Sequence, residues 1–141
     1  MFKTLAFAAA TLSLAVSAPL AAQDDAPVTK GEAKLAEMLE GRVAGEPSNC
    51  IRTFGSRNLQ QIDDTALVYR DGDTVWVNYT KSPSSIDDDD YLVIRKFTNS
   101  QLCRTDQVTT RDRFGNFFSG VIILDDFIPY RMPEHGTTNA G

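Results

Sequence analysis

The stretch TALVYRDGDTVWVN, Thr65 to Asn78, places two runs of β-branched and aromatic residues on either side of Asp71-Gly72. Such residues favour strands, and Asp-Gly between two of these runs is a strong hairpin signal. We therefore predict a hairpin with a two-residue loop at Asp71-Gly72, in which Val68 faces Val75. One predicted face carries Ala66, Val68, Val75 and Val77, and the other carries Leu67, Tyr69 and Trp76. Because both faces are largely apolar, we expect the hairpin to lie at the centre of its sheet.

Further runs with the period of strands lie on both sides of this hairpin. They are NCIRTF (49–54), YLVIRKF (91–97), LCRTDQVTTR (102–111) and FFSGVIIL (117–124). The last two are separated by a turn at 114–116, and residues 131–141 have no periodicity and should fray. Six or seven short strands predict a mostly antiparallel sheet, rolled into a small barrel or sandwich over residues 49–130.

One short amphipathic helix is expected before the strands. Thr29 and Glu32 have the spacing of a capping box. Leu35, Leu39 and Val43 then recur every four residues and form one apolar stripe. Residues 23–48 are therefore a polar leader followed by a helix, and the predicted fold class is mainly β (α+β).

The first 22 residues, MFKTLAFAAATLSLAVSAPLAA, have the layout of a cleavable secretory signal. Lys3 gives the positive start, an apolar run follows, and small residues precede Gln23. A membrane anchor would need roughly 20 continuous apolar residues, and Pro19 interrupts the run. We therefore expect export to the periplasm and no membrane insertion after cleavage.

The charge of the chain argues against polyanionic partners. It has 14 Lys and Arg against 19 Asp and Glu, and the predicted signal contains one base and no acid. Cleavage therefore leaves 141 minus 22, or 119, residues with a charge of 13 minus 19, or −6. That length suits one compact domain, and an acidic domain has no general attraction to nucleic acid or anionic lipid.

The two cysteines, Cys50 and Cys103, are expected to form a disulfide. Exported proteins meet an oxidising compartment, and the bond would close a loop of 54 residues. Two cysteines are too few for a structural zinc site, and the single histidine, His135, lies in the polar tail. A catalytic cysteine would need a nearby base, and no residue in the sequence points to one.

Two acidic runs border two apolar runs: Asp87, Asp88, Asp89 and Asp90 precede YLVI, and Asp125 and Asp126 follow VIIL. The spacing does not fit an EF-hand, whose sixth position is glycine, because Leu92 occupies that position. A looser calcium site could form if the two runs approach. An acidic docking patch is a second hypothesis. The third is that the carboxylates stay solvated and prevent edge-to-edge strand pairing.

Assembled catalytic machinery is not evident in the sequence. It has no G-x-S-x-G motif and no glycine-rich phosphate loop, and we assign no catalytic residue and no cofactor. A pair of carboxylates of the glycosidase type stays open, because the distance between acids is invisible at this level.

Five basic residues, Arg95, Lys96, Arg104, Arg111 and Arg113, could form a strip that binds an anionic ligand. The ordinary alternative is that they pair across strands with Asp106 and Asp112 on a solvated face.

Three stretches form a recognisable set: Cys50-Ile51, the run from Ile62 to Asn78, and LCRTDQV from Leu102 to Val108. Together they resemble a proteobacterial family of small exported proteins of unknown function, found for example in sphingomonads, over roughly residues 41–130. Thr105 stands where relatives often have glycine, and Ser82 to Ser85 stand where some have further cysteines. The resemblance implies a periplasmic setting and supplies no activity, ligand or catalytic residue.

These features together predict a non-enzymatic binding or accessory domain of the cell envelope. Its partner would be an envelope protein or a small ligand, and inhibition of an envelope-directed hydrolase is one concrete form. The alternative is a carboxylate-based hydrolase, with calcium as its one conceivable cofactor.

Overall fold

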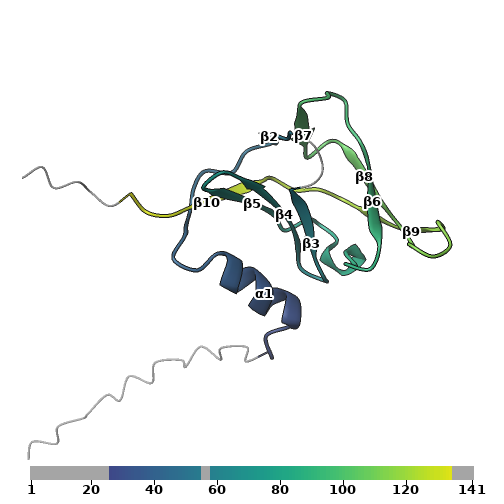
Figure 1. Cartoon of the computed structure of the whole chain (residues 1–141), viewed down its shortest axis with the longest axis horizontal. Coiled ribbons are helices and arrows are strands. Elements are labelled where there is room, and N and C mark those ends of the chain that lie inside the picture. Colours follow the sequence, from purple (N-terminus) through teal and green to yellow (C-terminus); the bar gives the residue numbers. More distant parts are fainter. Residues whose placement is uncertain (1–25, 55–57, 135–141) are drawn as a thin grey trace, which may run out of the picture.

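The computed structural model describes residues 26–54 and 58–134, which form one α-helix, one 3₁₀ turn and ten short strands (Figure 1). All strand pairs are antiparallel, so the prediction of a mainly β chain is confirmed. The predicted signal segment and His135 lie outside the described residues.

Helix α1 spans Lys30–Met38 and begins with the predicted capping box. The Thr29 hydroxyl accepts a hydrogen bond from the Glu32 amide at 3.2 Å, and the Glu32 carboxylate accepts one from the Thr29 amide at 2.8 Å. The extension of the apolar stripe to Val43 was wrong. Gly41 adopts a positive φ of 71° after the helix has ended, and Val43 lies in a strand with 60% of its surface exposed.

The largest sheet has five strands in the order β1-β10-β5-β4-β3. Their bounds are β1 Val43–Ala44, β3 Leu59–Ile62, β4 Ala66–Asp71, β5 Thr74–Asn78 and β10 Ile128–Arg131. The predicted hairpin supplies β4 and β5, which lie inside the sheet as expected. Strand β10 was missed, because Pro129 and the lack of periodicity around it suggested a frayed tail. Strand pairing therefore runs from Val43 to Arg131, beyond the predicted limits of 49 and 130.

The predicted register of the central hairpin was wrong by two residues. Asp71 pairs with Thr74, so the loop is Gly72-Asp73, and Val68 faces Val77. The positive φ of 55° falls on Gly72, the first loop position, as in a turn that begins with glycine. A shift of two preserves the alternation of side chains, so the predicted composition of both faces is confirmed.

The remaining strands form two smaller sheets, a pair β2-β7 and a triplet β6-β8-β9. Their bounds are β2 Cys50–Arg52, β6 Tyr91–Arg95, β7 Gln101–Cys103, β8 Gln107–Arg111 and β9 Phe118–Ile122. The single strand predicted over 102–111 is therefore two strands. The chain turns between them because the buried Asp106 carboxylate accepts hydrogen bonds from the amides of Cys103 and Phe97, at 2.7 and 3.0 Å.

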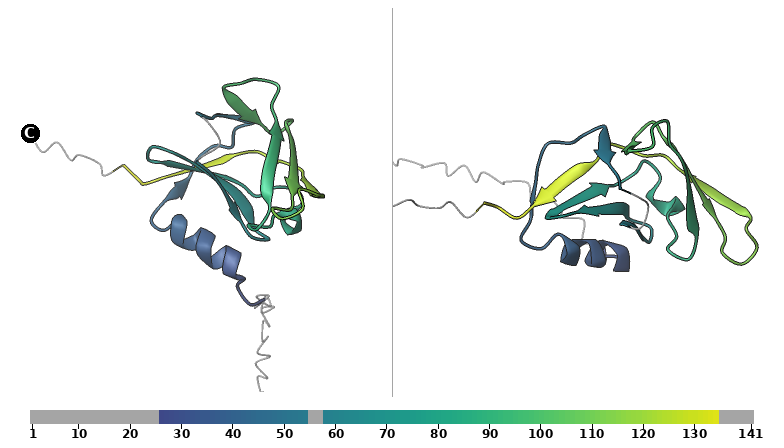
Figure 2. Two further views of the ribbon diagram at one scale, coloured as in Figure 1. Left: turned by 45° about the vertical axis from the view of Figure 1, so that its right-hand side comes forward. Right: turned by 45° about the horizontal axis from the view of Figure 1, so that its top comes forward.

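The elements are arranged in layers (Figure 2). One core cluster lies between α1 and the five-stranded sheet and contains Leu35, Val68 and Val77. The other lies on the opposite face of that sheet and joins Tyr69 of β4 to Val108 of β8. The described residues form no closed barrel, and the sheets are arranged like a sandwich. None of the helices in the described part is long and apolar enough to cross a membrane.

Candidate functional site

A disulfide joins Cys50 of β2 to Cys103 of β7, which confirms the predicted pair. The two residues lie directly opposite each other in the ladder, so the bond ties the two strands together. Both cysteine sulfurs are used in this bond, so neither is a free thiol.

A groove of about 470 Å³ opens where the edge of the five-stranded sheet meets the edge of the triplet. Strand β3 forms one wall and β6 forms the other (Figure 1). The lining residues are Leu59, Gln61, Asp90, Tyr91, Leu92, Ile94, Lys96 and Arg113. The lining residues of the β3 wall are Leu59 and Gln61, and those of the β6 wall are Asp90, Leu92, Ile94 and Lys96, with Tyr91 as an exception to the alternation. Every second residue is expected to line the groove when the side chains lie on the inner faces of two sheets. This volume lies within the range of small-ligand sites.

The floor of the groove is aliphatic and its ends are basic. Leu59, Leu92 and Ile94 pack against the core between the sheets. Lys96 donates to the Thr53 hydroxyl at 2.6 Å, and Arg113 donates to the main-chain oxygen of Asp88 at 3.1 Å. Among residues 26–54 and 58–134, neither cation has a carboxylate oxygen within 4.0 Å. The groove therefore holds two cations without a direct ion-pair partner in the described structure, and the Asp90 carboxylate also lines it at the Arg113 end.

Gln61 lines the groove and has an enclosed side-chain oxygen without a partner in the described structure. Its side-chain nitrogen donates to the main-chain oxygen of Asp90 at 2.8 Å, which links the two walls. Its side-chain oxygen is buried and has no hydrogen-bond partner within the described part of the chain. A buried acceptor without a donor costs roughly 1–3 kcal/mol. Because the oxygen is enclosed, a donor could reach it only if the Gln61 side chain moved.

The four aspartates divide into two groups. Asp90 is only 8% exposed, and its carboxylate accepts a hydrogen bond from the Ser119 hydroxyl. Ser119 also lies 3.2 Å from the Thr110 hydroxyl, so Asp90 anchors the β8-β9 hairpin. The hypothesis that all four carboxylates are solvated is therefore wrong for Asp90, whereas Asp87, Asp88 and Asp89 are exposed.

Two of the exposed aspartates lie beside Asp63, a residue that no sequence motif marks. Carboxylate oxygens of Asp63, Asp87 and Asp88 lie within 4.8 Å of one another. Desolvation, followed by repulsion from Asp64, Asp88 and Asp87, raises the pKa of Asp63 above 3.8, against a smaller opposing hydrogen bond from the Asp88 main chain. Calcium takes about six to eight oxygens, so three carboxylates alone do not define a site. Calcium binding stays a prediction.

The second acidic run is held elsewhere in the described structure. The Asp125 amide donates to the Asn78 side-chain oxygen at 3.0 Å, and the Asn78 amide nitrogen donates back to the Asp125 carbonyl at 2.6 Å. Asp126 forms an ion pair with Arg104 at 3.0 Å. Neither residue belongs to the carboxylate cluster of Asp63, so the described residues do not build the predicted joint cage.

The five basic residues do not form one strip. Arg95 and Arg111 line a small hollow on the outer face of the triplet, whereas Lys96 and Arg113 line the groove. The predicted pairing with Asp106 and Asp112 was also wrong, because both carboxylates accept hydrogen bonds from main-chain amides. Asp106 holds the turn between β7 and β8, and Asp112 holds the β8-β9 turn.

A second hollow, of about 510 Å³, lies between α1 and the far end of β5. Tyr79 borders it, and its hydroxyl lies 2.8 Å from that of Tyr130. Desolvation and this hydrogen bond raise the pKa of Tyr79. The acidic residues that line this hollow are Glu32 and Asp64, and no basic residue is among its lining residues. We therefore take the β3-β6 groove as the candidate site.

The groove was not predicted because its β3 wall was not. LQQI, residues 59–62, has polar residues at its centre and no clear alternation, so it gave no strand signal. The only cue was the short distance in sequence between this run and the hairpin. No protein-family model matches the chain, and no curated protein or solved structure is detectably similar to it.

Proposed function

We propose that the protein is an exported binding module of the cell envelope. In this proposal the β3-β6 groove holds an amphipathic ligand that carries negative charge, and the protein does not change the ligand chemically. The observation that carries the proposal is the pairing of an aliphatic floor with Lys96 and Arg113, neither of which has a carboxylate partner in the described structure. Apolar surface with a few convergent polar groups is the usual composition of a binding pocket.

The groups that face the groove favour binding over catalysis. Ser119 and Asp90 form the closest pair of a hydroxyl and a carboxylate, and their contact fixes the hairpin beside the groove. A nucleophile of the hydrolase type needs a base that is itself oriented toward a reacting atom. We therefore expect saturable binding without turnover.

The envelope setting rests on the N-terminal segment and on the disulfide. Residues 1–22 have the layout of a secretory signal, and a Cys50–Cys103 bond persists in an oxidising compartment such as the periplasm. The resemblance to small exported proteobacterial proteins agrees with this setting. The ligand would then be an envelope protein or a small envelope molecule, and an envelope-directed hydrolase is one such partner.

Charge reversal in the groove tests the proposal. The tagged protein, Lys96→Glu/Arg113→Glu and the control Arg95→Glu are expressed in the periplasm and crosslinked, and captured material is identified by mass spectrometry. Arg95 is an apt control because it lies on the same strand as the groove wall but lines the outer hollow. We expect wild type and the control to capture the same component saturably and the double variant to lose it. Equal capture by all three, at matched melting temperatures, would refute the groove as the site.

A further inference from the structure

Both walls of the groove are edge strands. β3 is the last strand of the five-stranded sheet, and β6 is the first strand of the triplet. Each therefore has a ladder partner on one side only, β4 for β3 and β8 for β6. The main-chain groups on the other side of an edge strand can pair with an added strand. The groove thus lies between two open ladder edges.

The length of the groove fits a short extended chain. Its β6 wall begins at Asp90 and ends at Lys96, six residues later, and residues in strands advance by about 3.3 Å each. The groove is thus about 20 Å long, the length of roughly six extended residues. Leu59, Leu92 and Ile94 would contact alternate side chains of a chain that lay along it.

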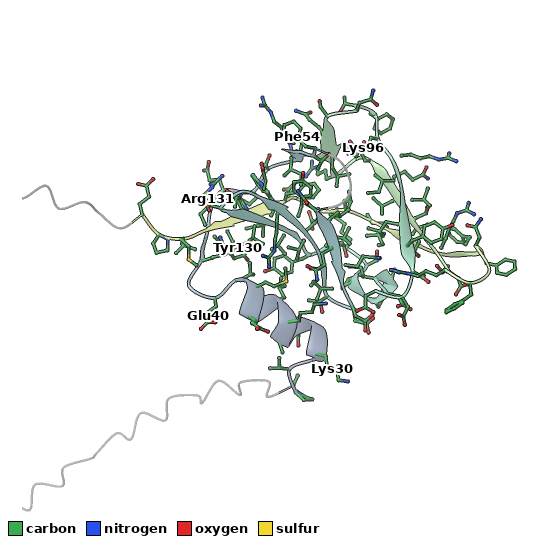
Figure 3. The ribbon with its side chains drawn as sticks, in the orientation of Figure 1. Lys30, Glu40, Phe54, Lys96, Tyr130 and Arg131 are labelled. Carbon is green, nitrogen blue, oxygen red and sulfur yellow. A yellow bond between two sulfur atoms is a disulfide. The ribbon has the colours of Figure 1, made fainter. Side chains whose placement is uncertain are left out.

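The polar groups of the groove match a peptide more closely than a purely apolar ligand. The Gln61 side chain crosses from β3 to Asp90, so a strand added between the walls must displace it. The N–H groups of a peptide can then supply the donor that the enclosed Gln61 oxygen lacks in the described structure. Lys96 lies at the end near the β2-β7 pair, where its ammonium group contacts Thr53 (Figure 3). Lys96 is half-buried, and its ammonium group is complementary to a carboxylate at one end of the chain.

We infer that the groove binds an extended peptide segment that adds a β-strand between β3 and β6 and places a carboxylate against Lys96. This inference rests on the proposed binding function and names the class of its ligand. The carboxylate is the C-terminus of the segment, and the segment belongs to another envelope protein. Strand addition gives affinity through the main chain and specificity through alternate side chains.

The first test uses displayed random octapeptides with free C-termini and the purified, oxidised mature protein. We expect enrichment of sequences that alternate apolar residues, and binding of the best synthetic peptide in solution. Lys96→Gln should weaken this peptide about tenfold and should not alter binding of its C-terminal amide. Arg95→Gln should leave both affinities unchanged. Failure to enrich any peptide, or equal loss for acid and amide, would overturn the inference.

The second test identifies strand addition directly. The best peptide is methylated at one main-chain nitrogen at a time, which removes a single N–H donor. Because alternate N–H groups of a strand added between β3 and β6 face one wall and then the other, methylation at every central position should weaken binding by about tenfold or more. Central positions that accept methylation without loss of affinity would exclude a strand paired with both walls.

The outcomes also separate this inference from the proposed function. If no peptide binds but the periplasmic capture still depends on Lys96 and Arg113, and the captured material is not a peptide, only the inference fails. If neither peptide binding nor groove-dependent capture is found, both fail.

Discussion

The side-chain nitrogen of Gln61 on β3 donates to the main-chain oxygen of Asp90 at 2.8 Å, and this bond links two sheet edges across 29 residues of sequence. The same amide leaves its oxygen buried without a partner in the described structure. The contact therefore holds the two walls of the groove together and leaves an enclosed acceptor beside it without a donor. A residue of this kind can serve binding at little gain in stability.

Replacement of Gln61 by leucine tests whether the hydrogen bond of its nitrogen is offset by the cost of its unpartnered oxygen. Gln61→Leu removes a hydrogen bond that contributes about 1 kcal/mol, but it also removes the unpartnered oxygen. We expect the free energy of unfolding, measured in urea, to change by less than about 1 kcal/mol. Gln60→Leu, at the neighbouring exposed position, is the control. A loss above about 2 kcal/mol would show that the oxygen has a donor in solution.

Removal of the disulfide should have the largest effect of a change outside the core. Cys50 and Cys103 are 53 positions apart, and on the chain-entropy model closing such a loop stabilises the protein by about 4 kcal/mol. We expect Cys50→Ser/Cys103→Ser to lose much of this free energy of unfolding. Reductant should lower the melting temperature of the wild type and leave that of the double variant unchanged. An equal response of both proteins would mean that the bond is not formed in solution.

Asp106 should contribute more to the free energy of unfolding than most turn residues do. Its two carboxylate oxygens accept hydrogen bonds from the amides of Phe97 and Cys103, and the residue is 6% exposed. Asp106→Ala leaves two amides without their acceptor, so we expect a loss of about 2–4 kcal/mol in urea unfolding. Asp112→Ala, which affects an exposed turn, should cost less. Equal losses would indicate that the Asp106 amide partners find other acceptors.

Substitution of aspartate by asparagine in the run before β6 should affect the melting temperature differently at Asp90 than at Asp88 and Asp89. Asp88→Asn/Asp89→Asn changes exposed residues, so we expect no loss of melting temperature and at most a small gain from weaker repulsion at Asp63. Aggregation, measured by light scattering, should be faster, because charge beside an apolar strand is lost. Asp90→Asn weakens the contact with Ser119 and should lower the melting temperature by several degrees. A strong destabilisation by the double substitution would instead reveal specific partners for Asp88 or Asp89.

The sequence predicts local features of this protein better than its long-range ones. The capping box at Thr29, the two faces of the central hairpin and the cysteine pair follow from spacing, and all three are present. The turn at Asp106 depends on a contact with Phe97, nine residues away, which no periodicity reveals. Strand β10 forms because partners at Val43 and Val75 exist to receive it.

The residues of the candidate site also depend on long-range contacts that the sequence does not reveal. Arg95 and Lys96 are adjacent in sequence, and the alternation of a strand sends them to opposite faces, which the sequence alone does not assign to core or solvent. Gln61 becomes a groove residue only because β3 and β6 meet across the sandwich. The chemistry of the groove therefore depends on pairing between distant segments.

The pH dependence of stability should report on Asp63. Because its pKa is raised in the folded state, the protonated form is favoured by folding, and the benefit is present below the unfolded value of about 3.8. It is lost as pH rises through the raised folded pKa, so ionised Asp63 destabilises the protein at neutral pH. Asp63→Asn should therefore raise the melting temperature at pH 7 by roughly 1–2 °C, and the gain should disappear below about pH 3.8. Salt should reduce the gain, because the carboxylates are exposed. Glu37→Gln makes the same change of charge on α1, away from the cluster. A gain from Asp63→Asn that persisted at low pH would mean that the amide stabilises the turn by its own hydrogen bonds instead of by relief of repulsion.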